Sequence, residues 1–304
     1  MVAAALLLDR LLGEPRRFHP LAGFGRLAAR LEASLNAGGR GHRLHGAAAL
    51  ALLVVPGVAL AGWLQQQPVA GALFSALVLY AAIGLNSLHQ HAEPVAAALA
   101  RDDLDAARVG VSMMVSRDTT ALDAEGVSRA TVESVLENGN DAVFGALFWF
   151  LVAGAAGALG YRLVNTLDAM WGYKTPRYRS FGWAAARLDD MINLPASRLA
   201  AIFLVVGAAV IGASPAGALR AVWRDASHHR SPNAGWPEAA MAGALGLKLA
   251  GPRVYGDETV DDAFMGDGRR DATAADIHRA LRLFRAACVT SWLLLLAIIL
   301  ISRG

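Results

Sequence analysis

The sequence predicts an all-α, polytopic integral membrane helical protein with cytoplasmic helical segments that form a polar mouth. Of its 304 residues, 55% are hydrophobic and only 17% are charged, whereas a soluble domain has about 25% charged residues. The mean hydropathy is +0.40. Five apolar segments (about 47–64, 68–85, 142–160, 199–213 and 288–302) alternate with polar ones (86–141, 161–198 and 214–286). We expect residues 1–304 to form a single membrane domain.

The chain opens with a short apolar stretch, residues 1–12, which Asp9 and Arg10 interrupt. A membrane span needs about 20 apolar residues, so this stretch is typical of a surface or half-buried helix. The segment GEPRRFHP, residues 13–20, then breaks the helix. It is either a basic loop at the membrane surface or a phosphate-binding loop, in which His19 is the candidate ligand.

Residues 26–46 indicate a surface helix and a Gly-rich loop, and the next two apolar segments indicate a transmembrane hairpin with an uncharged turn at 65–67. Seven Arg precede this hairpin. Because cytoplasmic loops carry the excess of basic residues, the N-terminus should be cytoplasmic. We therefore expect a multi-pass protein of the inner membrane with its polar mouth on the cytoplasmic side.

The first large polar segment, 86–141, contains Thr120 and Asp123 at the spacing of a helix capping box. The helix that follows carries four charged side chains at four-residue intervals, hence along one face: Arg129, Glu133, Glu137 and Asp141. A row of carboxylates is repulsive unless a cation lies among them, and Mg²⁺ prefers such oxygen ligands. A solvated helix face is the alternative interpretation.

The most charged stretch, residues 165–193, lies between two apolar segments. Its charged side chains are Asp168, Lys174, Arg177, Arg179, Arg187, Asp189 and Asp190. Ionisable groups beside hydrocarbon are costly and usually functional. If segments 142–160 and 199–213 both crossed the bilayer, this stretch would lie opposite the other polar motifs, against the charge bias. We expect both to enter only partway or to be buried against other helices.

The basic residues are 26 Arg and two Lys, Lys174 and Lys248. The Arg bias suits phosphate or carboxylate binding, although a GC-rich genome would produce the same bias. The single Cys288 excludes an internal disulfide and a Cys-based metal cage. The basic residues are scattered and match no nucleic-acid-binding module.

The last polar segment contains HHRSPNAGWPEAAMAGALG, residues 228–246, which predicts a small-residue helix starting near Trp236. The N-terminus of such a helix suits a phosphate or carboxylate, with Ser231 and Asn233 lining it and Glu238 in the first turn. Ordinary N-capping is the alternative. Farther on, Thr273 and Asp276 have capping-box spacing before a helix that places Ile277, Leu281 and Phe284 on one face.

Several motifs together resemble the CobD/CbiB family of membrane proteins in cobalamin biosynthesis. They are LDRLLGEPRRFHP at the start, SRDT at 116–119, VESVLEN at 132–138 with Asp141, VNTLDAMWGYK at 164–174, Tyr178, AARLDD at 185–190 and SPNAGWPEAAMAGALG at 231–246. The resemblance covers nearly the full length in the same order. The chain departs from the usual ENTVDG, since it reads ENGNDA at 137–142, and from the usual GDP near the start, since it reads GEP.

The resemblance implies an adenosylcobinamide-phosphate synthase. This ATP-dependent ligase joins the carboxylate of adenosylcobyric acid to the amine of an aminopropanol phosphate, and an acyl phosphate is the economical intermediate. Mg²⁺ and ATP are then required, and no Walker A pattern is present to hold the nucleotide. A non-catalytic membrane scaffold for late corrin-pathway enzymes is the alternative, and a small transporter is a third class.

The expected catalytic residues are Lys174, Asp168, Asp141, Glu137, Glu238 and Asp118. The expected substrate and phosphate contacts are Arg117, Ser116, Thr119, Asn138, Asn165, Thr166, Tyr173, Tyr178, Arg187, Asn193, Ser231, Asn233 and His19. The expected Mg²⁺ ligands are Glu133, Glu137, Asp141, Asp168, Asp189 and Asp190. The expected partners are membrane lipid, the corrinoid and the aminopropanol phosphate, with no nucleic acid. Other late enzymes of the pathway and a second copy of the chain are further candidates.

Overall fold

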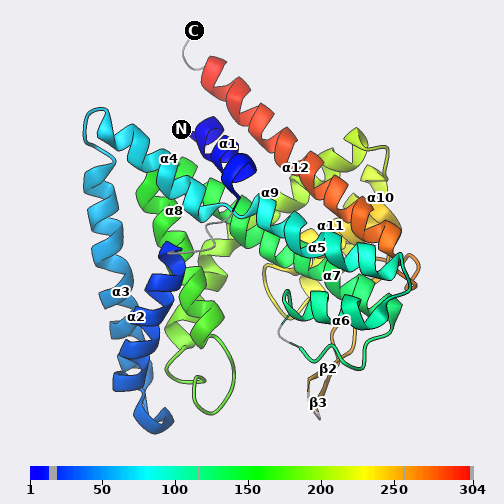
Figure 1. Ribbon diagram of the computed structural model, residues 1–304, viewed down its shortest axis with the longest axis horizontal. Coiled ribbons are helices and arrows are strands. Elements are labelled where there is room, and N and C mark those ends of the chain that lie inside the picture. Colours follow the sequence, from blue (N-terminus) through cyan, green and yellow to red (C-terminus); the bar gives the residue numbers. More distant parts are fainter. Residues whose placement is uncertain (14–18, 116, 256–257, 302–304) are drawn as a thin grey trace. The chain divides into compact units, whose positions relative to one another are not determined.

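The computed structural model describes residues 1–13, 19–115, 117–255 and 258–301 and confirms the all-α class (Figure 1). Its α-helices are α1 Val2–Leu12, α2 Pro20–Leu35, α3 Arg43–Leu64, α4 Ala70–Ala82, α5 Leu85–Leu99, α6 Leu104–Ser112, α7 Ala124–Gly139, α8 Ala146–Trp171, α9 Trp183–Val210, α10 Pro215–Asp225, α11 Gly235–Leu245 and α12 Ala274–Ile301. A π-helical turn covers Asn140–Gly145, and 3-10 turns cover Ala37–Gly39 and Ala226–His228. Four short strands are β1 Leu249–Ala250, β2 Arg253–Tyr255, β3 Glu258–Val260 and β4 Phe264–Met265.

Within the described residues, five helical stretches are long and apolar enough to cross a membrane: Arg43–Leu64, Ala70–Leu99, Ala124–Trp171, Trp183–Val210 and Ala274–Ala297. Each overlaps one of the five apolar segments of the sequence. The interpretation of 199–213 as a short apolar run is wrong in one respect. This run ends a 28-residue helix, α9, which begins inside the charged central stretch.

Contacts between residues divide the chain into two compact units. Unit 1 comprises Met1–Asn86 and Asp141–Pro195, and unit 2 comprises Ser87–Asn140 and Ala196–Gly304. Both units are therefore assembled from segments that are distant in the sequence, and each is described by itself below.

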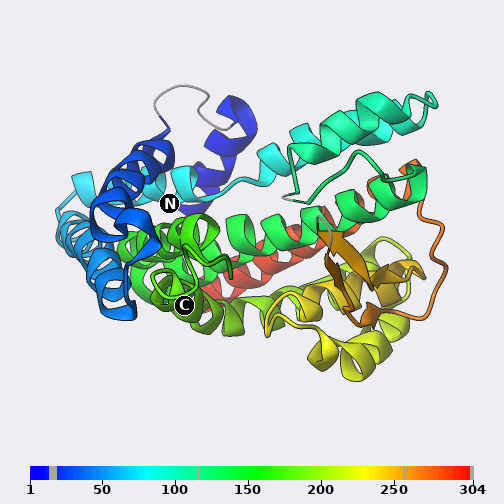
Figure 2. The same ribbon diagram turned by 90° about the horizontal axis from the view of Figure 1, so that it is seen from below.

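In unit 1, α8 packs against α3 and α4, while α2 lies on α3 and α8 and α1 lies on α4 (Figures 1 and 2). The core of this unit is built around Trp171, at the end of α8, and Phe181, just before α9. Their rings meet edge to face with centroids 5.0 Å apart, and both side chains are fully buried together with Leu167. This aromatic contact anchors both ends of the connection 172–182.

The connection 172–182 is also fastened to the end of α2. The Arg177 guanidinium donates to both carboxylate oxygens of Glu32, at 3.1 and 2.9 Å, and the Asn36 side-chain amide donates to the Arg177 carbonyl at 3.0 Å. Hydrogen bonding to Glu32 holds the pKa of Arg177 above its ordinary value. The charged central stretch is therefore an ordered part of unit 1.

Helix α8 is broken in its apolar half, where Ala153 has φ −137° and Gly154 has φ 64°. The Gln65 side-chain oxygen, from the turn after α3, accepts the freed backbone N–H of Ala156 at 3.2 Å. An unsatisfied N–H in hydrocarbon would cost several kcal/mol. Gln65 therefore acts as the N-terminal cap of the second half of α8.

In unit 2, α10 packs closely on α11, and α7 packs on α12. Gly217 and Gly243 allow the first contact, because a Cβ on either glycine would overlap the backbone carbonyl of the other. Gly139 allows the close contact between α7 and α12, since a Cβ there would overlap the Phe284 ring. Strand β1 pairs antiparallel with β4, Leu249 opposite Met265, and β2 pairs antiparallel with β3.

The capping box expected at Thr120 and Asp123 is wrong. Asp123 is itself the N-cap of α7, and its carboxylate accepts the Gly126 N–H at 2.7 Å. Thr120 instead donates to Asp118 through both its backbone and its hydroxyl. Asp at the N-cap position serves the same physical purpose, because its oxygen satisfies an orphan N–H of the first turn.

Of the two reciprocal hydrogen bonds expected in the capping box of Thr273 and Asp276, only the one accepted by Asp276 is made among the described residues. The Asp276 carboxylate accepts the Thr273 N–H at 2.9 Å, and the Thr273 hydroxyl also donates to it at 2.8 Å rather than accepting from the helix. The apolar face predicted for this helix is confirmed, since Ile277, Leu281 and Phe284 are all buried.

We predict that Gly46→Ala destabilises unit 1. A Cβ at this position in α3 would overlap the carbonyl of Phe181, and overpacking of this kind costs about 1–3 kcal/mol. The measurement is thermal unfolding of the purified variant in detergent. Gly23→Ala in α2 is the matched control, because its Cβ would meet only the flexible end of Arg26 at 3.8 Å. Equal melting temperatures for both variants would contradict the packing described here.

Candidate functional site

Unit 1 contains a group of four carboxylates, Asp141, Asp168, Asp189 and Asp190, which we call the acidic cluster. Asp141 lies in the π-helical turn, Asp168 near the end of α8, and the other two in α9. Asp168 is within Coulombic range of Asp141 and Asp190, and Asp189 is within range of Asp141 and Asp168. The structure therefore brings together four residues that the sequence separates by up to 49 positions.

Amide side chains hold this cluster in place. Asn165 Nδ2 donates to Asp141 Oδ2 at 2.9 Å and to Asp189 Oδ1 at 3.3 Å, and Asn193 Nδ2 donates to Asp189 Oδ2 at 3.0 Å. Asn165 and Asp168 are three residues apart on α8, and Asp189 and Asn193 are four apart on α9, so each pair shares a helix face. The predicted polar residues Asn165 and Asn193 thus lie at the cluster.

Tyr161 belongs to the same network, although the sequence reasoning missed it. Its buried hydroxyl lies 2.8 Å from Asn193 Oδ1 and 3.4 Å from Asp141 Oδ1. Its position four residues before Asn165, on the same face of α8, is the signal that could have found it. The phenol proton can serve only one of these two acceptors at a time.

Two cations face the cluster. Both Lys174 and Arg187 lie within Coulombic range of Asp190, and Arg187 Nη1 is 3.5 Å from Asp190 Oδ2. Lys174 is exposed on the connection 172–182, and Arg187 is exposed on α9. Lys174 and Arg187 therefore lie beside Asp190 within unit 1, whereas the candidate residue Glu238 belongs to unit 2.

The donor set of the acidic cluster fits Mg²⁺ chemically, because all four side chains offer hard carboxylate oxygens. Among the described residues, no group of three or more His, Cys, Asp and Glu side chains has the geometry to hold a metal by itself. Mg²⁺ is commonly held by one or two carboxylates together with substrate phosphates and water. The cluster suits that kind of shared site better than an all-protein cage.

The remaining candidates in unit 1 have local structural contacts. His19 is the N-cap of α2 and accepts the Leu21 N–H at 3.2 Å. The Thr166 hydroxyl donates to the Arg162 carbonyl within α8. Tyr178 packs against the core and lies under the Arg177 guanidinium, 5.7 Å from its ring centroid. Tyr173 is half exposed.

In unit 2, a cavity of about 260 Å³ contains three of the predicted residues, Arg117, Asp118 and Glu133; we call it the Arg117 cavity. Arg129 and Arg270, the latter unforeseen from the sequence, also line it. Arg117 Nη2 donates to Glu133 Oε2 at 3.2 Å, and the Ala250 N–H donates to Glu133 Oε1 at 2.9 Å. Three arginines thus face two carboxylates. Ser116 lies outside the described residues.

Arg117 retains a donor for a ligand. Its Nε is buried and has no hydrogen-bond partner among the residues that the structure describes. A buried donor of this kind is unfavourable unless an acceptor arrives, and a guanidinium suits the oxygens of a phosphate. The Arg117 cavity is therefore chemically suited to an anion.

The neighbouring residues of the SRDT motif differ in their roles. Asp118 accepts from the Thr120 N–H at 2.9 Å and from its hydroxyl at 2.8 Å, and these bonds hold the pKa of Asp118 below its ordinary value. A lower pKa makes Asp118 a weaker base. Thr119 is buried, and its hydroxyl donates to the Arg108 carbonyl at 3.2 Å.

The expected row of carboxylates on α7 is not uniform. Glu133 is buried and paired, whereas Glu137 and Asn138 are exposed. The Asn138 amide donates to the Ser134 hydroxyl at 2.8 Å. The π-helical turn that follows α7 also interrupts the 3.6-residue period, so the four-residue spacing does not extend to Asp141 as regular α-helix.

The SPNAGWPEAA motif forms the predicted start of α11. The Ser231 hydroxyl accepts the Asn233 N–H at 3.3 Å and the Ala234 N–H at 3.2 Å, so it orders the turn before α11. The N-cap of the helix is Ala234, which makes no side-chain capping bond, so the N-capping interpretation is wrong. Arg198 donates to the Asn233 side-chain oxygen at 3.2 Å and lies 4.5 Å from the centre of the Trp236 ring.

Glu238, in the first turn of α11, is fully buried. Its Oε2 lies 3.8 Å from Nε2 of His229, which is also buried. The sequence reasoning did not single out His229. Burial of a carboxylate beside an imidazole is an arrangement that can hold or pass a proton.

Comparison with known proteins decides the family. The sequence model of the CobD/Cbib protein family matches residues 2–284. The chain belongs to the CobD/CbiB family. It is 52% identical over 296 residues to a cobalamin biosynthesis protein CobD of Stutzerimonas stutzeri, covering 97% of this chain and 95% of the relative.

Two further relatives carry the same name. The protein of Chromobacterium violaceum is 52% identical over 288 residues, covering 92% of this chain and 89% of its own length. The protein of Mycobacterium tuberculosis is 43% identical over 304 residues, covering 99% and 95%. No solved structure matches this member of the CobD/CbiB family. The family and these names support a role in cobalamin biosynthesis.

We predict that Arg117→Met destabilises unit 2 by about 3–5 kcal/mol, because it leaves the buried Glu133 carboxylate without its charge partner. The measurement is unfolding of the purified variant in detergent. The double variant Arg117→Met with Glu133→Leu should recover most of the loss, since it removes the stranded charge as well. If the double variant is as unstable as the single one, the ion pair is not the cause.

Proposed function

We propose that this CobD/CbiB protein is an ATP-dependent ligase that joins the carboxylate of adenosylcobyric acid to the amine of an aminopropanol phosphate. The product is adenosylcobinamide phosphate. Membership of the family and the names of its relatives support the pathway. The observation that carries the chemistry is the acidic cluster with Lys174 and Arg187 beside it.

The reaction has two steps in this proposal. A carboxylate oxygen of the corrinoid attacks the terminal phosphorus of ATP, the bond to the bridging oxygen breaks, and ADP leaves. The amine nitrogen then attacks the acyl-phosphate carbon, the carbon–oxygen bond breaks, inorganic phosphate leaves, and a base takes the amine proton. Phosphoryl transfer of this kind depends mainly on positioning and charge neutralisation.

The residues of unit 1 suit the first step. Lys174 and Arg187 would bind phosphate oxygens, since both are exposed cations next to the cluster. Asn165 and Asn193 would keep the carboxylates in fixed orientations. One or two of the four carboxylates of the acidic cluster would hold Mg²⁺ together with the nucleotide phosphates and water, and the ion would offset the charge of those phosphates.

Glu133 is a weaker candidate metal ligand than the sequence implied, because both of its oxygens accept hydrogen bonds from Arg117 and Ala250. Glu137 stays in the candidate set as an exposed carboxylate. For the base, Glu238 is preferred over Asp118, because the hydrogen bonds from Thr120 weaken Asp118 as a proton acceptor.

The Arg117 cavity provides a second phosphate site in this proposal, and its three arginines suit the dianionic aminopropanol phosphate. The Arg-rich polar segments favour the cytoplasmic side of the inner membrane as the location of the chemistry. Both substrates and ATP would then be drawn from the cytoplasm.

We predict that Lys174→Met abolishes product formation while the protein still inserts into the membrane. The reason is loss of the exposed cation beside Asp190. The only other lysine, Lys248, gives a matched control, since its ammonium lies over the Phe264 ring and is remote in sequence from the cluster. Turnover is read as ADP release and as the mass of the amide product. Wild-type turnover by Lys174→Met would remove this residue from the site.

We predict that Asp168→Asn loses turnover but gains stability in metal-free buffer. The substitution removes one of several like charges that repel one another at short range, and functional sites commonly sacrifice stability in this way. Melting temperatures with and without Mg²⁺ test the idea. The exposed Asp102→Asn serves as the control and should change neither quantity. A lower melting temperature for Asp168→Asn without metal would contradict repulsion in the cluster.

The decisive test of the ligase uses wild-type protein purified in nanodiscs with adenosylcobyric acid, aminopropanol phosphate and Mg-ATP. Mass spectrometry should detect adenosylcobinamide phosphate in proportion to the ADP released. If properly folded protein forms no product with all three substrates, the scaffold alternative is favoured instead.

A further inference from the structure

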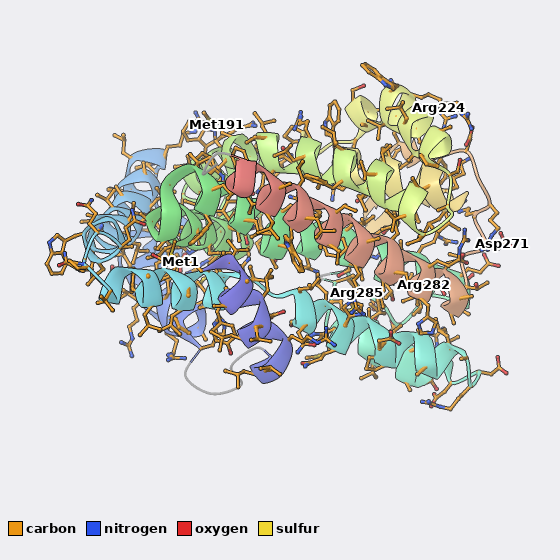
Figure 3. All side chains as sticks on the ribbon, turned by 90° about the horizontal axis from the view of Figure 1, so that it is seen from above. Met1, Met191, Arg224, Asp271, Arg282 and Arg285 are labelled. Atoms are coloured by element: carbon orange, nitrogen blue, oxygen red, sulfur yellow. The ribbon has the colours of Figure 1, made fainter. Side chains whose placement is uncertain are left out.

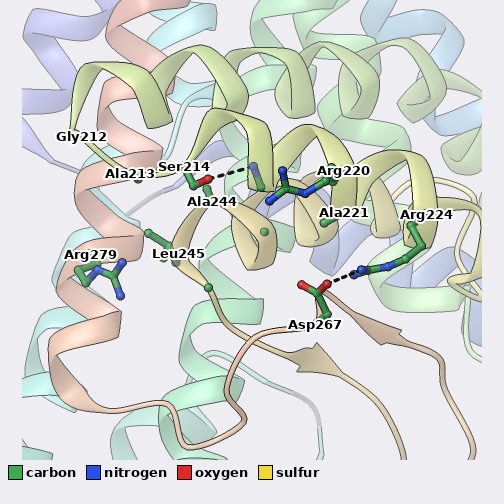
Figure 4. Close-up of a pocket in the computed structure, with 13 residues that line it drawn as sticks. Gly212, Ala213, Ser214, Arg220, Ala221, Arg224, Ala244, Leu245, Asp267 and Arg279 are labelled. Atoms are coloured by element: carbon green, nitrogen blue, oxygen red, sulfur yellow. Dashed lines mark hydrogen bonds and ion pairs between the residues drawn. The ribbon is translucent and has the colours of Figure 1, made fainter.

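A second cavity of unit 2, of about 530 Å³, uses none of the residues assigned to the reaction. We call it the Arg220 cavity. Arginines from two helices line it, Arg220 and Arg224 from α10 and Arg279 from α12, together with Gly212, Ser214 and Asp267 (Figure 4). Gly212 and Ser214 belong to the connection between α9 and α10.

The three arginines that line this cavity differ in their pairing. Arg224 forms ion pairs with Asp225 at 2.7 Å and with Asp267 at 2.6 Å, and Arg279 pairs with Asp276 at 3.0 Å. Arg220 is exposed and has no hydrogen bond or ion pair among the described residues, although Asp267 lies within Coulombic range. The cavity therefore offers one cation that is still free to bind an anion.

The position of the cavity relative to the apolar helices follows from contacts within unit 2. Gly207 of α9 packs directly on the backbone of Ala287 in α12. Gly212 lies five residues farther along the chain, just beyond the end of α9, and Arg279 lies eight residues back along α12, yet both line the cavity. The two helices thus run in opposite directions here, and the cavity lies beyond their shared apolar part.

The apolar part of α9 is exposed on one face. Ile202, Val206 and Val210, at four-residue intervals, are 56%, 44% and 64% exposed. On α12, exposed apolar side chains begin at Val289, after the charged turns that carry Arg282 and Arg285 (Figure 3). An apolar face of this kind suits lipid. The Arg220 cavity therefore lies at the level where both helices leave the hydrocarbon.

Helix α10, next to the cavity, has the composition of a helix that lies in a membrane interface. Leu219 and Trp223 are four residues apart and are 49% and 81% exposed, with Arg220 and Arg224 beside them. Trp is enriched at the headgroup level, and arginines extend toward lipid phosphates. An exposed Trp and Leu in this position would be unfavourable in water.

We propose that the Arg220 cavity binds the phosphate of an anionic phospholipid headgroup, with α10 lying in the membrane interface. Arg220 makes no hydrogen bond or ion pair among the described residues, so its guanidinium can donate to the phosphate oxygens. The Ser214 hydroxyl accepts from the Gly217 N–H at 3.0 Å and keeps its own proton to donate to a phosphate oxygen. The inference does not rest on the ligase reaction, because binding is measured without substrates.

The test uses purified full-length protein in a neutral detergent and measures the melting temperature against three probes. These are short-chain phosphatidylglycerol, short-chain phosphatidylcholine and inorganic phosphate. Phosphatidylglycerol should raise the melting temperature, and the other two should not. In Arg220→Gln the apparent dissociation constant for phosphatidylglycerol should rise about tenfold, as expected for loss of one charged hydrogen bond.

Arg282→Gln is the matched control, since Arg282 is exposed on the same end of α12 but does not line the cavity. It should bind phosphatidylglycerol like the wild type. Wild-type binding by Arg220→Gln would overturn the site. A shift of equal size with inorganic phosphate would also overturn the lipid assignment and would indicate a soluble phosphate ligand.

A second measurement tests the placement of α10 without relying on binding. In nanodiscs, lipids brominated near the headgroup end of the acyl chain should quench part of the tryptophan fluorescence, and Trp223→Phe should lose a share of that quenching. Unchanged quenching in Trp223→Phe would place α10 away from the bilayer and overturn this part of the proposal.

Discussion

Repulsion among the four carboxylates of the acidic cluster is the constraint that the rest of unit 1 must overcome. Asp168 is close enough to Asp141 and Asp190, and Asp189 to Asp141 and Asp168, for like charges to be unfavourable. Amide side chains and a phenol contact the carboxylates, and the connection 172–182 is fixed from both ends. The aromatic contact of Trp171 with Phe181 and the ion pair of Arg177 with Glu32 therefore support the site from outside it.

Periodicity and composition predicted the parts of the fold that depend on local sequence. The apolar face of α12 and the start of α11 near Trp236 are confirmed, because helix period and Pro or Gly breaks are local properties. The choice of Asp123 rather than Thr120 as the cap of α7 depends on where the helix begins, which spacing alone does not decide.

The site was predictable in its charged residues and much less so in their supports. Charge beside hydrocarbon indicates Asp168, Lys174 and Asp190 from the sequence alone. Tyr161 carries no charge, and Glu32 and Arg177 are 145 positions apart, so local sequence patterns indicate neither contact. Whether the candidate residues of unit 2 act together with those of unit 1 stays a prediction.

The arginines fall into two physical classes. Some are held by the fold: Arg177 by Glu32, Arg224 by two aspartates, and Arg198 by the Pro232 carbonyl and the Trp236 ring. Others retain donors among the described residues, including Arg117 at its Nε and the exposed Arg220. The number of basic residues alone therefore overstates the anion-binding capacity of the chain.

The break in α8, which Gln65 caps at Ala156, changes how the length of this helix relates to the thickness of the bilayer. Although α8 covers 26 residues, the non-helical backbone at Ala153 and Gly154 divides it into two shorter helical segments. A broken helix spans a shorter distance than a straight helix of the same number of residues, which would rise about 1.5 Å per residue. The length of α8 along the membrane normal therefore depends on the geometry of this break as well as on its residue count.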